Sequence, residues 1–134
     1  MVAEVKTGRG YVYMIEYHLV WCTKYRRKVL TGTVETDCYR ILQKVALEYG
    51  FEISELNGEA DHIHLLVACS PQHNIPDMVK VLKGICARKL FLLHPEIKSM
   101  LWGGHLWNPS YFVATVSENT EEQIRTYIQS QKVK

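Results

Sequence analysis

The chain has 134 residues, of which 47% are hydrophobic and 22% are charged, and its formal net charge is +2. This composition is typical of a single soluble globular domain over 1–134. It excludes a membrane span, because no run approaches the ~18 apolar residues that a span needs. Residues 1–9 are polar and lack the apolar core of a signal peptide, so we expect a flexible N-terminus and a cytoplasmic protein. The mild charge neither requires nor excludes a nucleic-acid partner.

A long strand is predicted over Tyr11–Cys22, which is rich in Tyr, Val, Ile and Trp and contains no Gly or Pro. A basic segment follows it and places positive charges around one aromatic ring. Its candidate contacts to a nucleic-acid backbone are Lys24, Arg26, Arg27 and Lys28. A solvated loop explains the same pattern equally well.

Two amphipathic helices are predicted. The first begins at a threonine cap, at position 31 or 33, and ends at Gly50, which suits a left-handed C-cap. The second begins near Asn74 and Pro76 and keeps apolar residues at helical spacing as far as Leu90. Its polar positions include Lys83, a further candidate contact to DNA, although charges on the wet side of a helix are usually only solvated.

Three further strands are predicted, over Phe51–Leu56, Glu59–Cys69 and Tyr111–Val116. Asn57-Gly58 is a strong signal for a two-residue hairpin between the first two. The order strand, helix, strand, strand, helix, strand predicts an α+β, ferredoxin-like (split βαβ) fold, in which an antiparallel sheet carries both helices on one face. The four cysteines form no C-x-x-C pair and are expected to be reduced thiols.

Trp102 and Trp107 flank a glycine-containing turn in the predicted loop over 94–109. If exposed, they could stack on nucleic-acid bases. If buried, they would close one end of the core, and the sequence favours neither arrangement.

Two histidines are the first candidate metal ligands. Apolar residues at 63, 65 and 67 alternate with His62, His64 and Leu66, which predicts a strand with one face on the core. His62 and His64 then share a face about 6.5 to 7 Å apart, where two imidazoles can converge on one metal ion. Histidines satisfied within the core are the structural alternative.

A last helix is expected over 120–134, with Thr120 and Gln123 in the positions of a capping box. Tyr127 and Gln131 lie one turn apart on its inward face. A metal bound by the Gln131 carbonyl oxygen would lie beside the Tyr127 hydroxyl and could polarise a phosphate oxygen. Amide and water oxygens favour Mg²⁺ or Mn²⁺, whereas imidazoles also accept Zn²⁺ or Ni²⁺. Ordinary packing of Tyr127 is the alternative.

A family resemblance rests on these residues. The stretch Ala60-Asp61-His62-Ile63-His64-Leu65-Leu66-Val67, with Tyr127 on a C-terminal helix and Gln131 one turn later, resembles the His-hydrophobe-His (HUH) single-tyrosine transposases of the IS200/IS605 group. The similarity continues through His18-Leu19-Val20-Trp21, Lys24-Tyr25-Arg26-Arg27, Lys83-Gly84, Leu106-Trp107 and Tyr111-Phe112-Val113. It covers nearly the whole chain.

The resemblance implies that Tyr127 attacks a phosphodiester of single-stranded DNA at insertion-sequence ends, giving a 5′-phosphotyrosine and a free 3′-hydroxyl. It implies that His62, His64 and Gln131 hold a divalent cation, Mg²⁺ or Mn²⁺, that orients the phosphate. It also implies DNA hairpins as the ligand and a homodimer in which Tyr127 of one subunit serves the histidines of the other. The alternatives are a replication or conjugation initiator nuclease and a non-catalytic or domesticated nucleic-acid-binding module of the same fold.

Overall fold

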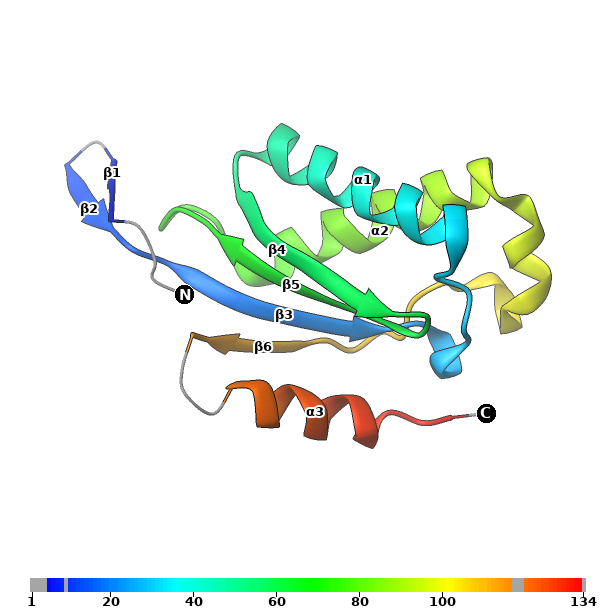
Figure 1. The fold of residues 1–134 in the computed structure, drawn as a ribbon. Coiled ribbons are helices and arrows are strands. Elements are labelled where there is room, and N and C mark those ends of the chain that lie inside the picture. The colour runs from blue at the N-terminus through cyan, green and yellow to red at the C-terminus, as the bar shows by residue number, and fades with distance from the viewer. Residues whose placement is uncertain (1–4, 9, 117–119, 134) are drawn as a thin grey trace.

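A computed structural model describes residues 5–8, 10–116 and 120–133. Its main sheet is antiparallel and has the strand order β4-β5-β3-β6 (Figure 1). The helix α1 connects β3 to β4, and α2 connects β5 to β6, which confirms the predicted α+β, ferredoxin-like topology. The bounds of these elements are β3 Glu16–Cys22, α1 Gly32–Tyr49, β4 Glu52–Glu59, β5 His62–Ala68, α2 Ile75–Leu93 and β6 Phe112–Thr115.

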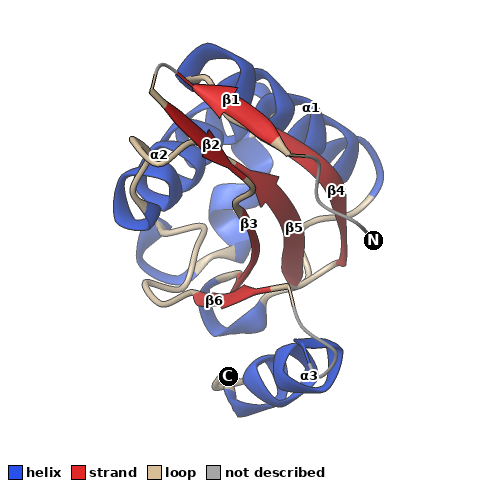
Figure 2. Ribbon diagram, turned by 90° about the vertical axis from the view of Figure 1, so that its left-hand side faces the viewer, coloured by secondary structure: helices blue, strands red, loops and turns tan. Residues whose placement is uncertain are grey.

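The core lies between the sheet and the two helices α1 and α2, which cover the same face (Figures 1 and 2). The residues Leu19 and Trp21 of β3 and Ile63 and Leu65 of β5 are fully buried there. Because strand residues alternate between faces, the residues between them point to the other side of the sheet. Burying one side chain of this kind contributes roughly 1.5 to 3 kcal/mol, so the alternation fixes which face carries the histidines.

The two core helices begin and end largely as their sequences predict. Gly50 caps α1 in the left-handed conformation, with φ of 79°. Thr31 occupies the N-cap position of α1 without a capping hydrogen bond from its side chain. The Asn74 side chain accepts a 2.9 Å hydrogen bond from the Asp77 amide at the start of α2, and α2 continues three residues past the predicted end at Leu90.

Cysteine thiols mark the place where these helices meet. Cys38 of α1 and Cys86 of α2 place their sulfurs 3.5 Å apart in the core. Both are free, as are the other two cysteines, Cys22 and Cys69, and all of them are buried. They behave as small apolar core residues, which matches the expectation of reduced thiols.

The N-terminal region differs from its prediction in two ways. The strand expected over Tyr11–Cys22 is divided, because β2 (Tyr11–Tyr13) ends three residues before β3 begins. A flexible segment was predicted over residues 1–9, but Lys6–Gly8 forms β1, which pairs with β2 in a separate ribbon. Gly10, with φ of 83°, allows the chain to fold back between them. Residues 1–4 and 9 of that prediction lie outside the described chain.

The predicted hairpin turn at Asn57-Gly58 is wrong. Both residues belong to β4, where Asn57 pairs with His64 and Gly58 with Ile63, and the turn lies at Ala60-Asp61. A Cβ on Gly58 would come within 2.3 Å of the His62 carbonyl oxygen, so this glycine serves a close approach of two strands. The pairing of β4 with β5, rather than the local turn signal, therefore determines the conformation of Asn57-Gly58.

The third helix, α3 (Thr120–Ser130), lies apart from α1 and α2 and contacts β3 and β6 (Figure 2). Ile124 of this helix is buried, with 7% of its surface exposed. The helix ends earlier than the predicted 120–134, and the capping role predicted for the Thr120 side chain lies outside the described residues. Three short 3-10 helices complete the described chain: η1 Lys24–Arg26, η2 Pro95–Met100 and η3 Trp102–Gly104. No helix among the described residues is long and apolar enough to cross a membrane.

Candidate active site

The sheet face opposite α1 and α2 gathers polar side chains from the two central strands. Antiparallel pairing sets Cys22 beside His62, Val20 beside His64 and His18 beside Leu66. Because paired residues share a face, His18, His62 and His64 all lie on the side away from the main core. The predicted shared face of His62 and His64 is thus what the strand register produces.

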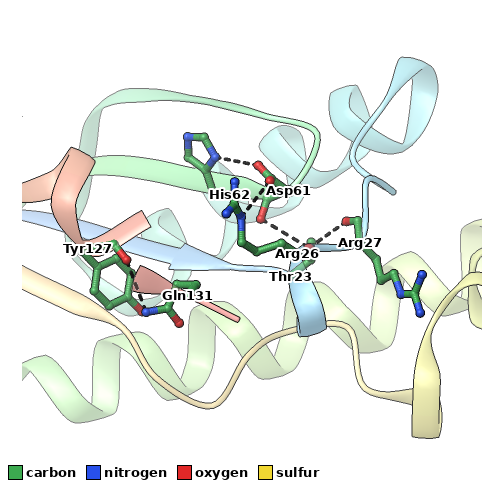
Figure 3. Close-up of polar contacts among 7 residues, drawn as sticks. All are labelled: Thr23, Arg26, Arg27, Asp61, His62, Tyr127 and Gln131. Atoms are coloured by element: carbon green, nitrogen blue, oxygen red, sulfur yellow. Dashed lines mark hydrogen bonds and ion pairs between the residues drawn. The ribbon is translucent and has the colours of Figure 1, made fainter. Parts of the chain in front are cut away.

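His62 is oriented by its sequence neighbour. Its Nδ1 lies 2.9 Å from Asp61 Oδ1, and the His62 side chain is only 13% exposed. Asp61 is itself buried, and its other oxygen accepts a 3.1 Å hydrogen bond from Arg26 Nε (Figure 3). Burial raises the pKa of Asp61, but the hydrogen bonds and charges of His62 and Arg26 together outweigh it, so the pKa lies below its ordinary value. The carboxylate is therefore ionised at neutral pH and links the guanidinium of Arg26 to the imidazole of His62.

His64 is paired with a histidine that the sequence did not single out. His18 Nδ1 lies 2.8 Å from His64 Nε2, and the two rings stack with centroids 5.0 Å apart. Burial lowers the pKa of both imidazoles, and the proximity of His18 lowers that of His64 further. Both rings are thus neutral at pH 7, which is the form in which imidazole binds metals.

Tyr127 and Gln131 form a second polar group, on α3. The Tyr127 hydroxyl lies 2.7 Å from Ser110 Oγ, and Ser110 Oγ donates to Gln131 Oε1 at 3.3 Å. The Tyr127 ring lies against Phe112 of β6, with centroids 5.6 Å apart. Burial raises the pKa of Tyr127 above its ordinary value, and the hydrogen bond with Ser110 partly offsets this increase. The hydroxyl is therefore protonated in the free protein.

The structure brings some of the predicted site residues together and leaves others apart. Tyr127 and Gln131 lie side by side, as their helical spacing predicts, and Gln131 Nε2 donates to the Tyr127 carbonyl oxygen at 3.4 Å. His62 belongs to a different hydrogen-bonded group, with Asp61 and Arg26 (Figure 3). Among the described residues, no hydrogen bond joins Tyr127 or Gln131 to His62.

The donor set on the sheet suits a divalent cation. Asp61 occupies Nδ1 of His62, which leaves Nε2 as its free donor atom, and His64 is neutral. Glu59 adds a carboxylate, and one ligand atom each of Glu59, Asp61 and His62 lies within 4.8 Å of the others. Nitrogen and oxygen donors of this kind accept Mg²⁺, Mn²⁺ and related ions. The predicted set of His62, His64 and Gln131 has the same chemistry.

The basic segment is folded tightly against the β4–β5 turn. Tyr25 and Arg26 both have φ of 54°, a conformation that costs roughly 1 to 2 kcal/mol for each residue that has a Cβ. Thr23 holds this segment, because its amide donates to Asp61 O at 2.9 Å and its hydroxyl to Arg27 O at 2.7 Å. Lys28 is exposed. Arg26, a predicted DNA contact, uses its Nε to bind Asp61.

Lys83, the other predicted DNA contact, is engaged inside the protein. Its Nζ donates to Asn108 O at 2.6 Å and to Ser110 O at 3.2 Å, and it lies over the Trp21 ring. Burial lowers the pKa of Lys83 to about 8. This lysine therefore fastens the loop that carries Ser110, whatever contact it makes with DNA.

Trp107 follows the buried alternative. It is 8% exposed, packs edge-on against Trp21 at a centroid distance of 6.0 Å, and donates from Nε1 to Lys83 O at 3.1 Å. It closes one end of the core and presents no face for a base. The side chain of Trp102 lies outside the described residues.

Sequence reasoning missed His18, Asp61 and Ser110. Asp61 directly precedes His62, so the adjacency was a usable signal for an orienting carboxylate. His18 has the right parity in its strand, but its contact with His64 requires the register of β3 against β5. Ser110 meets Tyr127 only after the chain has formed β6 and turned back, and no local pattern announces that contact.

Comparison with known proteins gives the class. The model of the family described as "Transposase IS200 like" matches residues 11–131, so the chain belongs to the IS200-like transposase family. It is 53% identical to "ISDra2 transposase TnpA" of Deinococcus radiodurans over 128 residues, which cover 96% of this chain and 91% of that protein. It is also 31% identical over 116 residues to the "Transposase for insertion sequence element IS200" of Salmonella typhimurium, covering 87% and 76% of the two chains.

Solved structures agree with this class. A crystal structure of a putative transposase from Deinococcus radiodurans superposes with a TM-score of 0.93 at 50% identity, covering 96% of this chain and 99% of that one. A REP-associated tyrosine transposase bound to a REP hairpin has a TM-score of 0.56 at 15% identity, covering 94% and 69%. The second similarity is one of fold.

Proposed function

We propose that this transposase cleaves and rejoins single-stranded DNA at insertion-sequence ends, with Tyr127 as the nucleophile. The observation that carries this proposal is the pairing of Tyr127 with Gln131 on α3, where the phenol contacts Ser110 Oγ at 2.7 Å. Tyr127 is part-exposed, and its hydroxyl has a polar partner outside the main core cluster. Membership of the IS200-like transposase family supports DNA strand transfer as the reaction.

The proposed step exchanges one phosphate ester for another. The Tyr127 oxygen attacks phosphorus and loses its proton to solvent or to a base, while the bond from phosphorus to the 3′-oxygen breaks and that oxygen takes up a proton. The products are a 5′-phosphotyrosine and a free 3′-hydroxyl. Because the ester linkage is conserved, the 3′-hydroxyl of another strand can reverse the step without ATP. The raised pKa of Tyr127 means that its deprotonation needs assistance once DNA is bound.

His62, His64 and Gln131 are the residues that we propose hold the cation, Mg²⁺ or Mn²⁺. When bound, the cation supplies Lewis-acid stabilisation of the phosphate oxygens. The chain contributes the imidazoles of His62 and His64 from one strand, and Asp61 lies 2.9 Å from Nδ1 of His62. Gln131 contributes an amide oxygen on the helix that also carries Tyr127.

A homodimer with shared sites would account for two polar groups that no hydrogen bond joins among the described residues of one chain. Tyr127 and Gln131 form one group and His62 another (Figure 3). We propose that α3 of one subunit serves the sheet of its partner, which would bring the nucleophile and the histidines together. Such a site exists only in the dimer.

The proposed DNA ligand is a single-stranded hairpin. A fold relative was solved bound to a REP hairpin, which motivates this choice. Lys24, Arg27 and Lys28 are the proposed phosphate contacts in the basic segment. The reaction would take place on DNA in the cytoplasm.

Covalent capture tests the nucleophile. The protein is incubated with end-labelled hairpin DNA from an insertion-sequence end and Mg²⁺ or Mn²⁺, and denaturing electrophoresis then separates adduct from free strand. Wild type and Tyr49→Phe, a change at an exposed tyrosine, should form the adduct, and Tyr127→Phe should not. Binding of the hairpin without any adduct in the wild type would support the non-catalytic module instead.

A further inference from the structure

Asp61 joins the candidate metal ligand His62 to an arginine. Its Oδ1 lies 2.9 Å from His62 Nδ1, and its Oδ2 lies 3.1 Å from Arg26 Nε. The side chains of Asp61 and His62 are 9% and 13% exposed, so solvent competes little for these bonds. The three residues form a series of hydrogen bonds from the basic segment to the sheet face opposite α1 and α2 (Figure 3).

The hydrogen bond from His62 to Asp61 determines which ring nitrogen of His62 can bind a metal ion. An ionised carboxylate can only accept hydrogen bonds, so Nδ1 of His62 must carry the proton and donate it. The lone pair then resides on Nε2, and the ring is held in one orientation. Carboxylates that bind the distal nitrogen of a metal-ligating histidine set its tautomer and orientation in this way.

The backbone around Arg26 is built to place its guanidinium. Tyr25 and Arg26 are the non-glycine residues with positive φ among those described, and both have φ of 54°. Arg26 N donates to Thr23 O at 2.9 Å, and Thr23 N donates to Asp61 O at 2.9 Å. The segment that bears the guanidinium is thus hydrogen-bonded to the same residue that the guanidinium binds. Strained backbone that neighbouring bonds maintain is characteristic of functional positions.

We propose that Asp61 and Arg26 are positioning residues of the metal centre: Asp61 fixes His62 with Nε2 toward the cation, and Arg26 holds Asp61 in place. This inference rests on the proposed function, in which His62 is a metal ligand. It assigns Arg26 to the site rather than to the DNA backbone, unlike Lys24 and Lys28 on either side of it.

Two measurements on the full chain test the inference. Long-range nitrogen–proton NMR of metal-free protein, at a pH well above the ordinary pKa of imidazole, reports the tautomer of each histidine. His62 should carry its proton on Nδ1 in the wild type, and Asp61→Asn should move a substantial fraction to Nε2. Titration calorimetry with Mn²⁺ should show about 10- to 100-fold weaker binding in Asp61→Asn and Arg26→Ala. Lys44→Ala, which removes an exposed cation on α1, should bind Mn²⁺ as the wild type does.

Reference variants separate the two levels of the proposal. Loss of Mn²⁺ binding in His62→Ala confirms the ligand, and unchanged binding there would overturn the proposed metal centre itself. If His62→Ala loses binding while a folded Asp61→Asn stays within twofold of the wild type, the positioning role alone is wrong. An Nε2-protonated His62 in the wild type would also overturn it, and this measurement needs no variant to fold.

Discussion

Lys83 Nζ lies 2.6 Å from the carbonyl oxygen of Asn108, so a helix that looks basic in sequence uses one of its cations to fasten a loop. The same ammonium also reaches Ser110 O at 3.2 Å, and Ser110 contacts Tyr127. The position of the tyrosine helix therefore depends on a half-buried lysine in the opposite layer.

Lys83→Met should lower the stability of the fold and leave the affinity for DNA unchanged. Removal of the ammonium leaves two carbonyl groups without their donor, which we expect to lower the free energy of unfolding by about 1 to 2 kcal/mol. The slope of log K against log salt for single-stranded DNA should stay at the wild-type value. Lys28→Ala, as the matched change, should reduce that slope by about 0.7 and leave the melting temperature unchanged. A lower slope in Lys83→Met would restore this lysine as a phosphate contact.

Two glycines make a matched pair for stability. At Gly58 a Cβ would meet the His62 carbonyl oxygen at 2.3 Å, so Gly58→Ala should cost about 1 to 3 kcal/mol and disturb the β4–β5 hairpin. Gly84, on α2, has nothing within 4 Å of the added Cβ, so Gly84→Ala should stabilise the protein by about 0.5 to 1 kcal/mol. Urea unfolding of both variants checks the signs, and equal effects would contradict the assigned register.

Asp37 should make stability depend on acid pH. Arg40 and His94 bind its two oxygens at 2.8 and 2.7 Å, and these hydrogen bonds lower the pKa of Asp37. Because the folded pKa lies below the unfolded value of about 3.9, the stabilisation is present above that pH and is lost as the pH falls through the folded pKa. The difference in melting temperature between wild type and Asp37→Asn should therefore shrink below about pH 4. A difference that persists into strong acid would show that the carboxylate does not act through its charge.

Mixed dimers test the shared site. A Tyr127→Phe chain and a His64→Ala chain are each expected to be inactive alone. If one subunit's Tyr127 serves its partner's histidines, a dimer with one chain of each kind has one intact site. An equal mixture should then recover roughly a quarter of wild-type adduct formation, because about half of the dimers are mixed and each has one of two sites. No recovery in dimers verified as mixed would show that each chain uses its own tyrosine.

The sequence predicts most of the fold because its local signals agree with the tertiary structure. The cap at Gly50, the start of α2 at Asn74 and the face shared by His62 and His64 all follow from patterns within a few residues. Asn57-Gly58 misled because a strong turn signal was outweighed by the close packing that Gly58 permits in β4. The register of a sheet is a long-range property, and turn propensity does not determine it.

In the candidate site, too, local contacts can be predicted from the sequence and long-range contacts cannot. Tyr127 and Gln131 share a helix, so their proximity can be read from spacing alone. The contacts of His64 with His18 and of Asp61 with Arg26 join segments that are distant in sequence. The positive charge of Arg26 is evident from the sequence, but its hydrogen bond to the buried carboxylate of Asp61 is not.

The strand order has a consequence for the timing of synthesis. The central strand β3 is made early, yet its two neighbours, β5 and β6, come from the middle and the end of the chain. Pairing β3 with these strands closes long loops, and the entropic cost of that closure slows formation of the sheet. A nascent chain therefore carries His62 and His64 before it carries α3, so the proposed metal ligands on the sheet are synthesised before Tyr127, the proposed nucleophile.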